Sequence, residues 1–179
     1  MITIEYRIFH RHTAENLTIY KRLIKDFNLQ QEGTRTDLYS PFTAATGCGL
    51  KFREGKLEIK SLISSELIDG LTVSSWEKLP LNGNLHRDQW LVVEKKRFLN
   101  FFNLKAQQIV SAEESQSQLE ISEVKYNEQK YLSVCVEASG EKQKLALNNM
   151  LFTLQQSTDY QSLQKTGYRA SYPEFLISD

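Results

Sequence analysis

The sequence predicts an α+β fold in which a mainly antiparallel β-sheet or barrel is flanked by helices. Two observations lead to this prediction. Stretches with the two-residue alternation of strands follow one another with few helical stretches between them, whereas parallel sheets alternate strands with helices. Only 8 glycines and 3 prolines interrupt the 179 residues, so the regular elements are expected to be long. A chain of this length suits a single domain, residues 1–179, with a core of its own.

The first two expected elements are a strand and a helix. Residues 2–9 alternate between an apolar face and a mixed face, which is the period of a strand. Thr13 can cap the helix that follows, which is expected over residues 14–27 because its apolar residues fall in one stripe at helical spacing.

Eight further stretches are expected to form strands, and two more are expected to form helices. The strands are residues 30–39, 45–53, 56–63, 67–78, 88–102, 105–111, 117–126 and 130–138. The last two should form a hairpin across Asn127–Gln129. Helices are expected over 141–156 and 159–165, and the aromatic C-terminal stretch ASYPEFLI should pack against the rest of the chain.

Overall composition excludes some classes of function. The 22 basic and 22 acidic residues cancel, which argues against a general nucleic-acid binder but allows a locally basic cavity. Cys48 and Cys135 have no metal-site spacing, which is typical of a reduced, intracellular chain. No basic-then-apolar leader and no apolar run near about twenty residues is present, so we expect a cytoplasmic protein without a membrane partner.

Charged residues occupy alternate positions of nearly every expected strand. In the stretch GLKFREGKLEIKSLI, residues 49–63, Lys51 and Arg53 share one face, and Lys56, Glu58 and Lys60 share the corresponding face after a Glu-Gly turn. For one strand, the wet side of an open sheet is the simplest explanation. Because the pattern recurs on strand after strand, we interpret these faces as the lumen of a closed barrel. Such a lumen would hold a polyanion, and its carboxylates could hold a divalent cation.

The order of these segments resembles that of the CYTH superfamily, the triphosphate tunnel metalloenzymes. That family opens with a strand carrying E-x-E-x-K, to which Thr3, Glu5 and Arg7 in TIEYR are similar. The stretches TDLYSP, GLKFREGKLEIK, LEISEV, VCVEA and SYPEFL resemble later family segments, and Lys95 and Arg97 resemble a K-x-R strand.

The resemblance implies a fold and a site. The fold is an antiparallel β-barrel, or tunnel, of about eight strands with flanking helices, in which basic residues grip a triphosphate and carboxylates bind Mg²⁺ or Mn²⁺. By position, the phosphate-binding candidates are Arg7, Lys51, Arg53, Lys60, Lys95 and Arg97, joined by Arg35 from the charged face of its strand. The metal-binding candidates are Glu5, Glu120 and Glu137, and no catalytic residue is assigned.

The departures from the family pattern concern mainly the acidic residues. Thr3 replaces the first glutamate of the opening motif, Cys135 a glutamate of the late E-x-E, and Ser122 an aspartate expected near Glu120. Each lost carboxylate weakens a site for a hard divalent ion, whereas anion binding tolerates these losses.

Three hypotheses for the function follow. The protein is a metal-dependent hydrolase of a triphosphate, or a catalytically degenerate module that binds a small phosphorylated anion, or a scaffold whose charged faces are simply solvated. The sequence also leaves a homodimer open.

Other reactive residue types have simpler explanations. His10, His12 and His86 are expected to be exposed near strand ends rather than metal ligands. Cys48 lacks a base for a nucleophilic role, so we expect a buried or tight-turn cysteine. Trp76 and Trp90 are expected to anchor the core or its rim. No glycine-rich phosphate loop occurs, which leaves side-chain cations to bind phosphate.

Overall fold

The computed structural model describes residues 1–41, 47–81, 89–170, 172 and 175. Its barrel strands are β1 (Ile2–Arg11), β2 (Gln30–Tyr39), β3 (Cys48–Arg53), β4 (Lys56–Ile68), β5 (Leu71–Leu81), β6 (Leu91–Phe102), β7 (Ser117–Tyr126) and β8 (Gln129–Ser139). The remaining elements are α1 (Ala14–Asp26), α2 (Gln143–Gln155), α3 (Thr158–Thr166) and the short strand β9 (Tyr168–Arg169).

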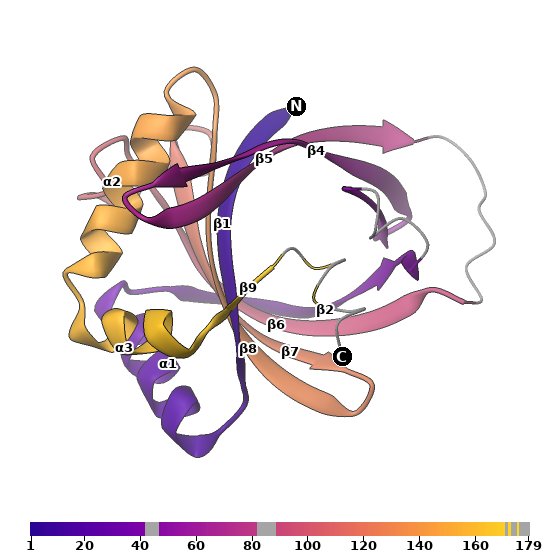
Figure 1. Ribbon diagram of the computed structural model, residues 1–179, viewed down its shortest axis with the longest axis horizontal. Coiled ribbons are helices and arrows are strands. Elements are labelled where there is room, and N and C mark those ends of the chain that lie inside the picture. The colour runs from indigo at the N-terminus through magenta and orange to yellow at the C-terminus, as the bar shows by residue number, and fades with distance from the viewer. Residues whose placement is uncertain (42–46, 82–88, 171, 173–174, 176–179) are drawn as a thin grey trace.

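The eight long strands form a closed antiparallel barrel (Figure 1). Their order is β5-β4-β3-β2-β6-β7-β8-β1, and β1 pairs back to β5, with Ile4 opposite Ser75. β9 adds to the other end of β1, where Ile8 lies opposite Arg169. The predicted antiparallel barrel with flanking helices is therefore confirmed.

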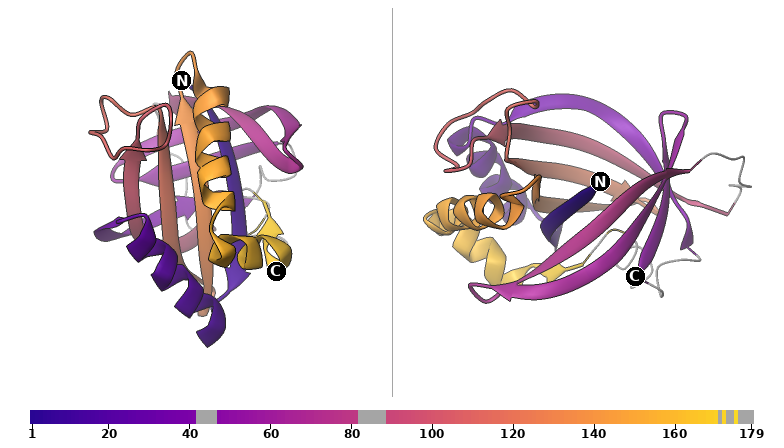
Figure 2. Two further views of the ribbon diagram at one scale, coloured as in Figure 1. Left: turned by 90° about the vertical axis from the view of Figure 1, so that its left-hand side faces the viewer. Right: turned by 90° about the horizontal axis from the view of Figure 1, so that it is seen from above.

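The three helices within the described residues all lie on one side of the barrel (Figures 1 and 2). Ile4, Tyr6 and Ile8, on the outward face of β1, are fully buried in a cluster that includes Leu147 and Met150 of α2. The apolar face expected for the first strand thus packs against the helices, and its mixed face points into the lumen. Among the described residues, no helix combines the length and apolar character needed to cross a bilayer.

A second cluster of buried side chains lies inside one end of the barrel. Phe9, Tyr39, Val93 and Val124 lie on the same inward face of their strands as the charged or polar lumen residues, two positions from Arg7, Asp37, Lys95 and Ser122. They pack with Tyr126, Tyr131, Tyr172 and Phe175. Phe9 and Phe175 stack with ring centroids 4.0 Å apart. Tyr172 and Phe175 belong to the C-terminal stretch that was expected to pack down, and both are buried.

Three hairpins turn on two residues with positive φ. The residues are Glu54–Gly55, Asp69–Gly70 and Asn127–Glu128. Two-residue turns of this kind match the twist of the strands they join. The expected hairpin near 127–129 is confirmed. The boundary expected between strands 56–63 and 67–78 was wrong, because β4 continues to Ile68 and the chain turns at Asp69–Gly70.

Other expected strand limits also need correction. Residues 105–111 form turns with one isolated bridge, Ile109 to Phe102, instead of a strand. The side chain of Asn103 explains part of this, since its Oδ1 accepts from the backbone N–H of Gln107 and so favours a turn. Residues 45, 46 and 88 of two other expected strands lie outside the described residues.

Candidate functional site

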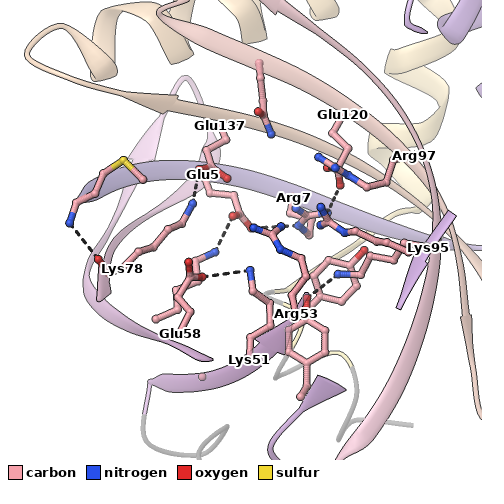
Figure 3. A pocket seen from close by; sticks show the side chains of 17 residues that line it. Glu5, Arg7, Lys51, Arg53, Glu58, Lys78, Lys95, Arg97, Glu120 and Glu137 are labelled. Carbon is pink, nitrogen blue, oxygen red and sulfur yellow. Dashed lines mark hydrogen bonds and ion pairs between the residues drawn. The ribbon is translucent and has the colours of Figure 1, made fainter. Parts of the chain in front are cut away.

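The lumen of the barrel contains a cavity of about 260 Å³ lined mainly by charged side chains (Figure 3). All ten residues predicted for the site line it, namely Glu5, Arg7, Arg35, Lys51, Arg53, Lys60, Lys95, Arg97, Glu120 and Glu137. They come from seven strands and share one cavity because each points inward at alternate positions. The alternative of an open, solvated sheet face is therefore wrong.

Two further charged residues, Lys78 and Glu58, also line the cavity without having been assigned a role from sequence. Lys78 follows Ser74 and Trp76 at two-residue intervals on β5, and this alternation was the signal for its inward direction. Lys56, from the same charged face as Lys60, is exposed and is absent from the cavity lining.

Four residues on β1, β6 and β7, which we call the deep wall, form a compensated cluster: Glu5, Arg7, Arg97 and Glu120. Arg7 Nε donates to Glu5 Oε1 at 3.1 Å, and Arg7 Nη1 lies 3.6 Å from Glu120 Oε1. Arg97 Nε donates to Glu120 Oε2 at 2.6 Å. None of these side chains is more than 12% exposed. Buried charges of this kind persist only when paired.

The deep wall strongly shifts the pKa values of its carboxyl groups. Burial alone would raise the pKa of Glu120, but the charges of Arg7, Arg97 and Lys95 outweigh it and lower the pKa to about 2. Burial likewise opposes ionisation of Glu5, yet Lys60 and Arg7 hold its pKa well below the usual range. Both carboxylates are therefore ionised at neutral pH.

Lys95 is enclosed beside the deep wall. Its Nζ donates to Asp37 Oδ2 at 2.7 Å and to the Tyr39 hydroxyl at 2.5 Å, and it lies 3.5 Å from the centroid of the Tyr172 ring. Burial lowers the pKa of Lys95 to about 7, although the charge of Asp37 acts in the opposite direction. Arg35 Nε lies 3.3 Å from the other oxygen of Asp37.

Four residues on β3 and β4, which we call the hairpin wall, are more open: Lys51, Arg53, Glu58 and Lys60. Lys51 pairs with Glu58 at 3.1 Å, and their side chains are 19% and 28% exposed. Lys60 reaches Glu5 Oε2 at 2.7 Å and so connects the two walls. Arg53 has no hydrogen bond or ion pair with any described residue.

The three residues predicted to bind Mg²⁺ or Mn²⁺ are each paired with cationic side chains of the cavity. Glu5 is held by Lys60 and Arg7, Glu120 by Arg97, and Glu137 by Lys78. Nowhere in residues 1–41, 47–81, 89–170, 172 and 175 do three His, Cys, Asp or Glu side chains gather so that they could hold a metal ion. Divalent ions of this type need several free oxygens, and here cations already occupy these carboxylates.

The histidines and Cys48, the other reactive residue types in the sequence, were expected to have no role in a site. His10 is buried, contrary to the prediction of an exposed histidine, and its ring nitrogens lie 2.7 Å from the Tyr20 hydroxyl and 2.7 Å from the Leu163 carbonyl. His12 lies 3.9 Å from Glu123, and His86 lies outside the described residues. Cys48 is partly buried beside Ser61, with 3.7 Å between Sγ and Oγ.

Both tryptophans are largely buried, as predicted, with Trp76 6% and Trp90 9% exposed. Lys60 Nζ lies 4.6 Å from the Trp76 ring centroid, and this cation–π contact helps to hold Lys60 at the cavity.

Comparison with known proteins identifies the fold. By sequence, no family model and no curated protein matches the chain. By structure, it matches the Pct1 RNA triphosphatase of S. pombe, solved in complex with the Spt5 CTD, with a TM-score of 0.51, 11% identity and coverage of 92% of this chain and 82% of that one. The chain has the triphosphate tunnel fold.

Two further solved structures resemble this tunnel protein. The putative adenylyl cyclase HpAC1 from Hippeastrum, whose structure is described as revealing a dominant triphosphatase activity, has a TM-score of 0.49 at 10% identity, covering 98% of this chain and 95% of that chain. The PH1819 protein from Pyrococcus horikoshii also has a TM-score of 0.49 at 10% identity, covering 97% and 98%.

Proposed function

We propose that this protein binds a small, multiply charged phosphate anion inside its tunnel, and that triphosphate is the first candidate. The observation that carries the proposal is the excess of cations in one enclosed cavity, which eight cationic and four carboxylate side chains line. Walls of low dielectric strengthen the field of such an excess and attract anions.

Arg53 gives the anion a first point of attachment. Its guanidinium lines the cavity and makes no hydrogen bond or ion pair with a described residue, so its donors are available to phosphate oxygens. Glu58 is near enough for the charge of Arg53 to help lower the pKa of that carboxyl group. A guanidinium can bind phosphate through two parallel hydrogen bonds. Lys51 and Lys60, on the same hairpin wall, line the same cavity and could contact further phosphate oxygens.

The size of the cavity favours a compact ligand. Its volume of about 260 Å³ is below the roughly 300–1,000 Å³ that is typical of pockets for drug-sized molecules. An inorganic triphosphate or a similarly short phosphate chain suits it better than a bulky substituted nucleotide. The fold shared with Pct1, an RNA triphosphatase, makes triphosphate the natural probe.

Metal-dependent hydrolysis of a triphosphate is the second candidate. It is favoured by the placement of Glu5 directly opposite Glu137 on neighbouring strands β1 and β8, which brings two carboxylates to the same part of the wall. Both are engaged by lysine or arginine, however, and this is why we rank binding first.

Titration with tripolyphosphate followed by isothermal calorimetry tests the proposal. We expect saturable binding in EDTA, and the same binding in Arg22→Ala, since Arg22 pairs with Asp159 on the helices, outside the tunnel. Absence of binding at millimolar tripolyphosphate would contradict the proposal. Phosphate release that requires added Mg²⁺ or Mn²⁺ would favour the second candidate instead.

A further inference from the structure

Glu5 lies where two cavities meet. It lines the central cavity, and together with Arg7 it also lines a smaller cavity of about 160 Å³. The smaller cavity is bounded on its other sides by Ser74, Trp76 and Arg169, among others. The side chains of Glu5 and Arg7 therefore stand between the two spaces.

Both oxygens of the Glu5 carboxylate are occupied. Lys60 Nζ donates to Oε2 at 2.7 Å, and Arg7 Nε donates to Oε1 at 3.1 Å. Lys60 is on β4 and Glu5 is on β1, and β5 lies between these strands in the barrel. The Lys60–Glu5 ion pair thus crosses the inner face of β5, and Arg7 holds the Glu5 carboxylate from the same strand.

A phosphate oxygen would make the same contacts as this carboxylate. Charge-assisted hydrogen bonds from lysine or arginine to either kind of oxygen have similar lengths of about 2.7–2.9 Å. An anion that binds Lys60 and Arg7 therefore competes with Glu5 for their donors and their positive charge. Only 6% of the Glu5 side chain is exposed, so water screens the negative charge of its carboxylate very little.

We propose that Glu5 is an internal competitor for the anion, because its carboxylate occupies the place between Lys60 and Arg7 that a phosphate oxygen takes in the bound state. The inference rests on the proposed function and adds a role for one residue within it. Removing the negative charge of Glu5 strengthens anion binding. A carboxylate that only adds negative charge to the cavity, without occupying the cations that the anion binds, has a smaller effect on binding in EDTA.

Glu58 provides a matched control. It lines the same cavity and carries the same charge, but its one ion pair among the described residues is with Lys51, and it is 28% exposed, compared with 6% for Glu5. Glu5→Gln and Glu58→Gln change the net charge of the cavity equally. A general effect of charge would therefore strengthen binding to a similar extent in both variants.

Calorimetric titration of tripolyphosphate in EDTA tests the inference on the wild type and both variants. We expect Glu5→Gln to lower Kd by about tenfold to a hundredfold, the range that corresponds to one hydrogen bond between charged groups. Glu58→Gln should lower Kd by less than about threefold, because its carboxylate is partly screened by water. An unchanged or raised Kd in Glu5→Gln, or equal gains in both variants, would overturn the inference.

Glu5→Asp covers the case in which Glu5→Gln does not fold. It keeps the charge that compensates Arg7 but shortens the side chain by one methylene, so that it can no longer hold both cations. We expect its Kd to be lower than that of the wild type, and an equal or higher Kd would count against competition. If neither the wild type nor Glu58→Gln binds tripolyphosphate, the proposed function itself fails.

Discussion

The deep wall and the hairpin wall are built from the same residue types but differ in how their charges are compensated. On the deep wall, each of Glu5, Arg7, Arg97 and Glu120 has an opposite charge within 3.6 Å, and none is more than 12% exposed. On the hairpin wall, the Lys51–Glu58 pair is 19% and 28% exposed, and Arg53 has no partner within the described part of the chain.

This difference indicates a division of roles. A buried charge that loses its partner is costly, whereas a partly hydrated pair contributes little to stability. The deep wall should therefore contribute most to the stability of the fold, and the hairpin wall should supply cations that a ligand can engage with little loss of folding free energy. Glu5 and Arg7 take part in both, since the anion competes with Glu5 for Arg7 at the edge of the deep wall. Lys60 belongs to both, because it extends from the hairpin wall to Glu5.

Breaking the deep wall should have the largest effect. Arg7→Met leaves Glu5 and Glu120 with fewer cations in a buried site, and we expect the free energy of unfolding to fall by about 3–5 kcal/mol. Urea denaturation measures this loss. The control is Lys51→Met on the hairpin wall, where we expect a loss of less than about 1 kcal/mol. Equal losses in the two variants would remove the distinction between the walls.

Removing Arg53, the cation of the hairpin wall that has no ion pair among the described residues, should affect binding instead of stability. Arg53→Ala should raise the Kd for tripolyphosphate about tenfold, which is the worth of one hydrogen bond to a charged group in a partly exposed site. Its melting temperature without ligand should stay close to that of the wild type, since no described partner is left unpaired. A lower melting temperature with an unchanged Kd would show that Arg53 contributes to stability and not to binding, contrary to this prediction.

The pH dependence of anion binding should report the charge of Lys95, which is buried like the deep wall but lines the cavity where the anion binds. Its pKa of about 7 means that the amine is protonated below pH 7 and neutral above it, because burial disfavours its charged form. Affinity for sulfate, whose own charge is constant between about pH 6 and 8, should therefore fall as pH rises. We expect a loss of about threefold to fivefold, the scale of one charge at short range in a hydrated site.

Lys95→Met provides the comparison for this pH effect. The variant has no titrating amine at this position, so its sulfate affinity should be flatter with pH than that of the wild type. An equally steep pH dependence in both proteins would assign the effect to another group.

The inward faces of the strands were predictable from sequence, because alternation alone puts Lys51 and Arg53, or Lys95 and Arg97, on one side. The turn at Asp69–Gly70 was also encoded, and the D-G signal explains why β4 is longer than expected. The absence of a strand at 105–111 depends on contacts of Asn103 that periodicity does not contain.

The pairing of charges could not be predicted in the same way. Lys60 and Glu5 are 55 residues apart and lie on strands that are not neighbours, so their contact depends on the closure and register of the barrel. The sequence showed which side chains face the lumen but not that lysine and arginine occupy the carboxylates expected to bind metal. The burial of His10 likewise depends on α1 and α3 packing against β1, through Tyr20 and Leu163.

The central claim is that cations from separate strands act together on one anion inside the barrel. A crystal structure with tripolyphosphate soaked in the presence of EDTA tests this claim most directly. The account predicts phosphate density in the lumen, with Arg53 and Lys60 in contact with its oxygens. Density only on the outer surface of the barrel, with the Lys60–Glu5 pair intact and the lumen free of phosphate, would contradict it.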